Sequence, residues 1–228
     1  MTETIIERYQ RVQERIKKAC IKYDRNPKDI QLLAVSKTKP IEDIQHLAQT
    51  GQSCFGENYV QEAIEKIAVL PKLEWHFIGP IQSNKTKHIA NAFDWVHSVD
   101  RLKIAQRLND QRPEDKAPLN ILLEVNIDHE ASKAGFEFNA VEEAAHAIQS
   151  MPKLRLRGLM VIPKKSQQLD EQRKPFAALR TLMNQLNKKH PDWQLDTLSM
   201  GMSADLEAAI AEGATIVRIG TDIFGARP

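Results

Sequence analysis

Cysteine is scarce in this sequence, which has only Cys20 and Cys54 among 228 residues. Two cysteines without CxxC spacing or a histidine cluster provide neither a disulfide framework nor a zinc motif, so we expect no metal site and a reducing compartment. Long hydrophobic runs are also missing, and the charged amino-terminal stretch predicts neither a signal peptide nor a membrane span. These features favour a cytoplasmic protein.

An excess of one charge is missing as well, because 32 Lys and Arg residues face 30 Asp and Glu residues, a formal net charge of +2. There is no basic tail, so nucleic acid is not an expected partner. With 9 Gly, 11 Pro and 42% hydrophobic residues, the chain has the composition of an ordinary globular protein. Its length favours one domain, residues 1–228. Since no large apolar stripe is evident, we expect a monomer.

Short apolar runs alternate with longer segments of helical periodicity along most of the chain. Eight strands are predicted, at 31–35, 53–55, 74–78, 94–96, 120–126, 155–160, 194–198 and 215–219. Helical patterns follow the strands, for example at 41–49, 59–70, 102–109, 141–149, 171–189 and 205–211. Eight strands separated by helices in a chain of this length predict an α/β fold. They favour a (β/α)8 TIM barrel rather than a doubly wound open sheet.

An additional helix is predicted before the first strand. Apolar residues recur at helical spacing from Ile5 to Ile16, and Thr4 with Glu7 matches a capping box. One apolar face of this helix must pack on the barrel.

Parallel barrels carry their active sites at the carboxyl ends of the strands, and Lys37 follows the first strand there. Partial desolvation lowers the pKa of a lysine and frees its amine to form a Schiff base with an aldehyde or ketone. The alternative is an exposed lysine that pairs with a carboxylate.

Asn58 follows the second strand and has Gln61 three residues further on, a spacing that also suits a helix cap. On that interpretation Gly56 supplies a tight turn. Only the clustering of turn residues at the barrel mouth argues for a functional role.

A phosphate site is expected after strands seven and eight, where this fold often holds one. Gly201 and Ser203 precede a helical pattern, and Gly220 with Thr221 follows the eighth strand. Backbone N–H groups and hydroxyls at these positions can bind an anion. The alternative is simple capping, with Ser203 as the N-cap residue. Arg218 lies beside this corner, either as a ligand contact or as an ordinary arginine in a salt bridge.

A lysine opposite a phosphate corner suits a phosphorylated aldehyde, and pyridoxal 5'-phosphate (PLP) has both groups. Three functions remain open on this reasoning. The first is a non-catalytic PLP-binding protein, and the second is a PLP-dependent amino-acid racemase-like or transaminase-like enzyme. The third is a Schiff-base aldolase that uses no cofactor and binds a sugar phosphate.

Several motifs resemble those of the pyridoxal phosphate homeostasis protein family, also called YggS or PROSC proteins. The matching strings span the chain and are AVSKTKP, FGENYVQEA, WHFIGPIQSNKTK, SKAGF, RGLMVIP, SMGMSADLEAAI and VRIGTDIFGAR. The resemblance implies a barrel similar to the N-terminal domain of alanine racemase. It also implies a set of cofactor-binding residues: Lys37 as the Schiff base, Ser203, Gly220 and Thr221 at the phosphate, Arg218 at the ring nitrogen, and Asn58 and Met200 beside the ring. Lys39, Lys85 and Lys133 correspond to lysines near the family's cofactor mouth, without a settled role.

The resemblance implies a function in intracellular PLP (vitamin B6) homeostasis and amino-acid and keto-acid balance rather than in catalysis. PLP-dependent apo-enzymes that receive the cofactor are then the expected partners. Alanine racemase needs a second base, a tyrosine from another domain, whereas Tyr9, Tyr23 and Tyr59 all precede the third predicted strand here. A two-base racemase is therefore not expected, while one-base chemistry through Lys37 stays open.

Overall fold

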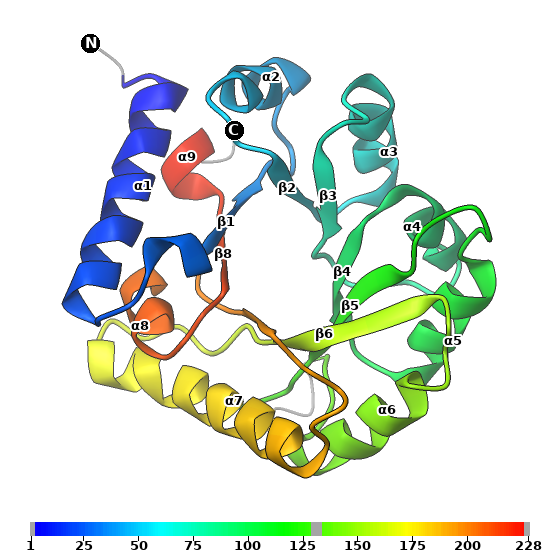
Figure 1. The fold of residues 1–228 in the computed structure, drawn as a ribbon. Coiled ribbons are helices and arrows are strands. Elements are labelled where there is room, and N and C mark those ends of the chain that lie inside the picture. Colours follow the sequence, from blue (N-terminus) through cyan, green and yellow to red (C-terminus); the bar gives the residue numbers. More distant parts are fainter. Residues whose placement is uncertain (1–2, 129–133, 226–228) are drawn as a thin grey trace.

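The structure is a computed structural model that describes residues 3–128 and 134–225. Eight parallel strands follow one another around a closed barrel in chain order, and the last pairs with the first (Figure 1). They are β1 (Gln31–Val35), β2 (Cys54–Glu57), β3 (Glu74–Phe77), β4 (Trp95–Val99), β5 (Leu119–Glu124), β6 (Leu154–Met160), β7 (Thr197–Ser199) and β8 (Ile216–Ile219). This arrangement confirms the predicted TIM barrel.

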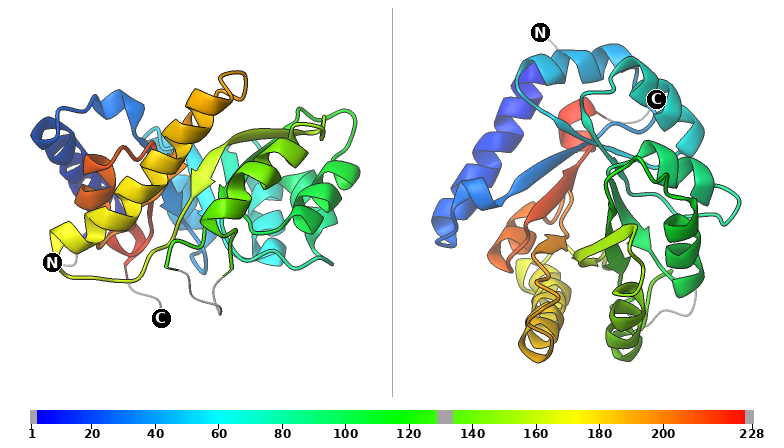
Figure 2. Two further views of the ribbon diagram at one scale, coloured as in Figure 1. Left: turned by 90° about the horizontal axis from the view of Figure 1, so that it is seen from below. Right: turned by 45° about the vertical axis from the view of Figure 1, so that its right-hand side comes forward.

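Helices surround the strands on the outside of the barrel (Figure 2). They are α1 (Ile5–Lys22), α2 (Ile41–Gln49), α3 (Val60–Val69), α4 (Thr86–Ala92), α5 (Leu102–Gln111), α6 (Val141–Ile148), α7 (Leu169–Lys189), α8 (Leu206–Ala211) and α9 (Thr221–Phe224), with short 3-10 turns at Pro27–Asp29 and Phe138–Ala140. Helices α2 to α8 connect successive strands. None of the helices formed by the described residues is both long and apolar enough to cross a lipid bilayer.

The predicted additional helix is α1. Thr4 and Glu7 form the capping box, with the Glu7 N–H donating to Thr4 Oγ1 over 3.2 Å. Val12 and Ile16 are buried on its inner face. The helix packs against α8 and α9, so the two ends of the described chain lie side by side (Figure 1).

The barrel architecture explains why the strands are buried on both faces. All five residues of β4 are buried, since a parallel sheet has side chains inside the barrel and helices outside it. Large buried residues such as Phe55, Trp75 and Phe77 lie on neighbouring strands.

Two local predictions are wrong. The seventh strand begins at Thr197 rather than at Gln194, whose positive φ of 50° interrupts an extended backbone. Gly56 does not form a tight turn but lies within β2. A Cβ atom there would contact the Leu33 and Ile78 side chains at 3.2–3.3 Å, so the position requires close packing rather than a bend.

Candidate functional site

The residues predicted for the site lie at one mouth of the barrel, at the carboxyl ends of the strands. Lys37 follows β1, Asn58 follows β2, Met200 and Ser203 follow β7, Arg218 lies in β8, and Gly220 and Thr221 follow β8. Strands β2, β1, β8 and β7 are consecutive neighbours in the barrel. The fold therefore gathers all of these positions along one continuous part of the rim.

Lys37 lies in a tight turn directly after β1. The Lys39 N–H donates to the Ser36 carbonyl over 3.1 Å, and Thr38 between them has a left-handed φ of 61°. The Thr38 N–H donates to Glu62 Oε1 over 2.6 Å. These contacts hold the backbone of the turn on both sides of Lys37, whose side chain is partly buried.

A buried ion cluster contacts this turn at the Ser36 carbonyl. Lys66 Nζ lies 2.8 Å from Glu57 Oε1 and 2.6 Å from Glu62 Oε1, and it donates to the Ser36 carbonyl over 2.8 Å. The Ser36 hydroxyl donates to Glu57 Oε1. Burial raises the pKa of Glu57, while the Lys66 ammonium opposes that rise. This cluster could not be predicted from the sequence, because it joins Ser36, Glu57 and two residues of α3 that no spacing motif links.

Arg218 is 4% exposed and binds the ends of two neighbouring strands. Its Nη1 donates to the Ser199 carbonyl and hydroxyl over 2.6 and 2.7 Å, and its Nη2 donates to the Val161 carbonyl over 2.9 Å. Burial lowers its pKa to about 10, so the guanidinium stays charged at neutral pH. The alternative of an ordinary salt-bridged arginine does not describe these contacts, which all go to neutral oxygens.

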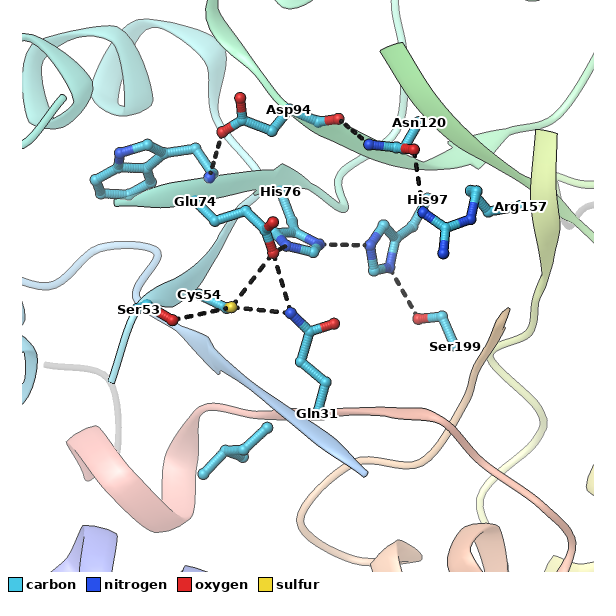
Figure 3. A network of polar contacts seen from close by, with 12 residues as sticks. Gln31, Ser53, Cys54, Glu74, His76, Asp94, His97, Asn120, Arg157 and Ser199 are labelled. Atoms are coloured by element: carbon cyan, nitrogen blue, oxygen red, sulfur yellow. Dashed lines mark hydrogen bonds and ion pairs between the residues drawn. The ribbon is translucent and has the colours of Figure 1, made fainter. Parts of the chain in front are cut away.

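A line of polar side chains continues from Ser199 through the barrel interior (Figure 3). Ser199 Oγ lies 2.8 Å from His97 Nδ1, His97 Nε2 lies 2.9 Å from His76 Nδ1, and His76 Nε2 lies 2.8 Å from Glu74 Oε1. Burial lowers the pKa of both histidines, so both rings are neutral. Contacts with the His76 ring hold the pKa of Glu74 at about 2, which keeps it ionised.

The donor-only guanidinium of Arg218 sets the direction of these hydrogen bonds. Ser199 Oγ accepts from Arg218 and its proton is available for His97 Nδ1. His97 Nε2–H then donates to His76, and His76 Nε2–H donates to the Glu74 carboxylate. In this arrangement every side chain of the line from Arg218 to Glu74 has a hydrogen-bond partner. The line holds Arg218 in place and connects the two mouths of the barrel.

The corner predicted for phosphate is formed by the loops after β7 and β8. Gly201 has a φ of 92°, and a Cβ atom there would lie 2.4 Å from Ala209 Cβ. At Gly220 a Cβ atom would lie 3.3 Å from the Val35 carbonyl, so glycine lets this loop approach the end of β1. Ser203 is half-buried and Thr221 is exposed.

Arg15 on α1 joins these two loops. Its guanidinium donates to the Ser203 carbonyl over 3.1 Å and forms an ion pair with Asp222 in α9. The sequence gives no sign of this role, because the contacts span most of the chain length.

Both capping alternatives are wrong. Helix α8 begins after Asp205, whose Oδ1 accepts from the Met202 N–H over 2.6 Å, so Ser203 is not the N-cap residue. Helix α3 begins after Tyr59, not Asn58. Asn58 Oδ1 is buried and accepts no hydrogen bond among the described residues. An amide oxygen in that state is available to a ligand.

The other predicted residues differ in their surroundings. Met200 is fully buried in the core directly after β7. Lys85 is exposed at the start of α4, and Lys39 closes the turn at Lys37. Lys133 lies outside the described residues.

Glu124 at the end of β5 adds an acid with an unusual pKa to this mouth. Burial and the nearby Asp100 carboxylate raise its pKa to about 7, while Arg218 opposes the shift. It lines a cavity with Val125 and Ile162. Perturbed acids beside a cavity are frequent at functional sites, and no sequence pattern singled out Glu124.

Comparisons with known proteins agree with this geometry. The family described as the N-terminal domain of alanine racemase matches residues 8–228. A protein from Pasteurella multocida (strain Pm70) named pyridoxal phosphate homeostasis protein is 51% identical over 228 residues, covering 98% of each chain. One of the same name from Pseudomonas aeruginosa is 54% identical over 226 residues, covering 98% of this chain and 96% of that protein.

A solved structure gives the same answer for the fold. PipY from Synechococcus elongatus PCC7942, described with PLP bound, superposes with a TM-score of 0.80 at 37% identity, covering 92% of this chain and 100% of that one.

Proposed function

Because the chain belongs to the alanine racemase N-terminal domain family and to its branch of pyridoxal phosphate homeostasis proteins, we propose that it binds PLP at the carboxyl mouth of the barrel. The cofactor is held as a Schiff base on Lys37. The protein serves intracellular PLP homeostasis and amino-acid and keto-acid balance rather than catalysis. The observation that carries this proposal is the alignment of Lys37, Arg218 and the two glycine loops along neighbouring strands.

The residues present fit such a cofactor. The buried, unpartnered oxygen of Asn58 provides a polar contact beside Lys37, and Gly220 leaves room where any side chain would crowd β1. When bound, PLP supplies an aldehyde that reacts with a lysine amine and an electron-accepting pyridine ring. Backbone N–H groups and the hydroxyls of Ser203 and Thr221 would hold its phosphate.

Arg218 would limit the catalytic power of a cofactor bound at this site. Its pKa of about 10 keeps it a hydrogen-bond donor at neutral pH, and its contacts with Ser199 and Val161 hold it in place. A cation facing the pyridine nitrogen disfavours protonation of the ring, which weakens carbanion stabilisation. This environment suits a carrier better than a catalyst.

A spectral titration tests cofactor binding. Adding PLP to the purified chain should produce visible absorption, and Lys37→Ala should lose that absorption and bind PLP about tenfold more weakly or worse. Lys39→Ala is the matched control and should retain the spectrum. A colourless wild-type protein in the presence of excess PLP would contradict the proposal and favour the aldolase alternative.

The racemase-like alternative is tested by turnover. The PLP-loaded chain incubated with single amino acids should give no enantiomer or keto acid above the Lys37→Ala background. Product that increases in proportion to protein and disappears in Lys37→Ala would establish one-base catalysis instead.

The proposed partners are PLP and the PLP-dependent apo-enzymes that receive it. We place this action in the cytoplasm, as the two free, buried cysteines favour a reducing compartment.

A further inference from the structure

A second group of polar side chains lies at the opposite mouth of the barrel, where β1, β2 and β3 begin. Gln31, Cys54 and Glu74 are the first residues of these strands, and His76 is two residues along β3 on the same face as Glu74. Cys54 and Glu74 are direct neighbours in the parallel register. Figure 3 shows the four side chains converging inside the barrel.

Electron-rich atoms of this group converge on one region. Cys54 Sγ lies 3.3 Å from Glu74 Oε1, which lies 2.8 Å from His76 Nε2, and the three atoms are all within 4.8 Å of one another. The Gln31 amide nitrogen lies between two of them, 2.9 Å from the sulfur and 3.0 Å from the carboxylate. A weakly positive N–H group thus occupies the place toward which the sulfur and the carboxylate point.

The chemistry of these donors suits a tetrahedral metal site, and their spacing needs only adjustment. Ligands about 2.0–2.3 Å from a zinc ion lie roughly 3.3–3.7 Å from one another. The 3.3 Å between Cys54 Sγ and Glu74 Oε1 is in that range, whereas the 2.8 Å between Glu74 Oε1 and His76 Nε2 must lengthen as an ion replaces their hydrogen bond. Thiolate, imidazole and carboxylate are the zinc ligands of proteins, and this mixture disfavours the hard cations Mg²⁺ and Ca²⁺. Turning the Gln31 amide over would present its oxygen as a fourth donor.

The surroundings hold the donors in place. The His76 ring stacks on Trp95 with an interplanar angle of 3°, and its Nδ1 bonds to His97 over 2.9 Å. Metal-binding histidines usually have such a partner on their second nitrogen. The Glu74 side chain is 40% exposed, which gives an ion a route from solvent.

We propose that Cys54, Glu74 and His76, with Gln31 as the fourth donor, form a binding site for Zn²⁺ or a similar thiophilic divalent cation. One thiolate and one carboxylate neutralise the two positive charges. The Cys54 thiol gives its proton to solvent. The proton on His76 moves from Nε2 to Nδ1 and is donated to His97 Nε2, so the proton on His97 moves to Nδ1 and is donated to Ser199 Oγ. One proton is therefore released for each ion bound.

This site departs from the expectation of no metal site, because its ligands come from three strands and no spacing motif joins them. It is also separate from the proposed PLP site. Binding of Zn²⁺ is expected with or without PLP, so failure of either proposal leaves the other intact.

The test is equilibrium dialysis of the full chain against Zn²⁺ with a competing chelator, followed by elemental analysis. The wild type should retain one Zn²⁺ per chain and melt at a higher temperature with the ion present. Cys54→Ser and Glu74→Gln should each weaken binding at least about tenfold. Cys20→Ser, which removes a cysteine from the buried face of α1, is the control and should bind like the wild type.

A second measurement keeps the proposal testable if a variant fails to fold. The Co²⁺-loaded wild type should show thiolate-to-cobalt charge-transfer absorption. No bound Zn²⁺ in the wild type, equal binding by Cys54→Ser, or a Co²⁺ complex without the thiolate band would overturn the proposal.

Discussion

A single residue, Glu124, makes the free energy of unfolding depend on pH. Its pKa is raised to about 7 in the folded protein, above the ordinary value of 4.5. Between these values the folded state holds a proton that the unfolded state has lost, so the free energy of unfolding falls as pH rises from about 4.5 to about 7. We expect a loss on the order of 1–3 kcal/mol across this window.

Glu124→Gln should reduce that slope, because glutamine does not titrate, while Glu57, whose pKa is also raised by burial, continues to contribute to it. Urea unfolding at several pH values between 4.5 and 8 measures it, with the exposed Glu143→Gln as a control that keeps the slope. Glu74, whose pKa is lowered to about 2, affects stability only as pH falls below about 4.5, so the two windows separate. A wild-type slope that persists in Glu124→Gln would contradict the assignment.

Lys66 is a second residue whose substitution should strongly lower the free energy of unfolding. Lys66→Met leaves the fully buried Glu57 carboxylate without its cationic partner, and breaking a buried pair costs about 3–5 kcal/mol. Urea unfolding should show this loss, whereas the exposed Lys72→Met should change stability by less than about 0.5 kcal/mol. Equal stability of the two variants would mean that the cluster is not needed to hold the turn at Lys37.

At the scale of elements, α1 clamps the corner proposed for phosphate. Arg15 connects the Ser203 loop to Asp222 in α9, so Arg15→Gln should loosen both loops together. We expect the Kd for PLP to rise about five- to tenfold, equivalent to roughly 1–1.4 kcal/mol. Since the ion pair is about one-third exposed, the cost in stability should be smaller.

The matched control is Arg11→Gln, whose wild-type side chain pairs with Glu3 on the exposed side of α1. Titration of both variants with PLP, followed by visible absorption, separates the two roles. Identical PLP affinity of Arg15→Gln and the wild type would show that α1 does not contribute to the site.

Regular elements were predictable where a local pattern sets them. β1 and α2 match their predicted ranges, and the capping box fixes the start of α1. The start of β7 was not predictable, because Gln194 adopts a left-handed backbone that its apolar neighbours do not signal. The four-residue helix α9 is too short for a periodic pattern.

The candidate site was predictable only in part. Lys37 and the glycine loops stand directly after strands, so their common location follows from the fold. Arg15, Lys66 and the polar line from Arg218 to Glu74 depend on contacts between elements far apart in the chain. Side chains of that kind look like ordinary surface or core residues in the sequence.

For the molecule as a whole, closure of the barrel is what links residue chemistry to function. Pairing of β8 with β1 brings the last strand beside the first. Lys37 and Arg218 therefore share one mouth of the barrel, although they lie near opposite ends of the sequence. The monomeric state and the single domain spanning residues 1–228 stay predictions. Light scattering of the PLP-loaded chain measures the oligomeric state directly.

Borohydride reduction of the PLP-loaded chain, followed by peptide mass analysis, tests whether Lys37 carries the Schiff base. We expect loss of visible absorption and one pyridoxyl adduct per chain, carried by Lys37. An adduct on another lysine, or none, would contradict this expectation.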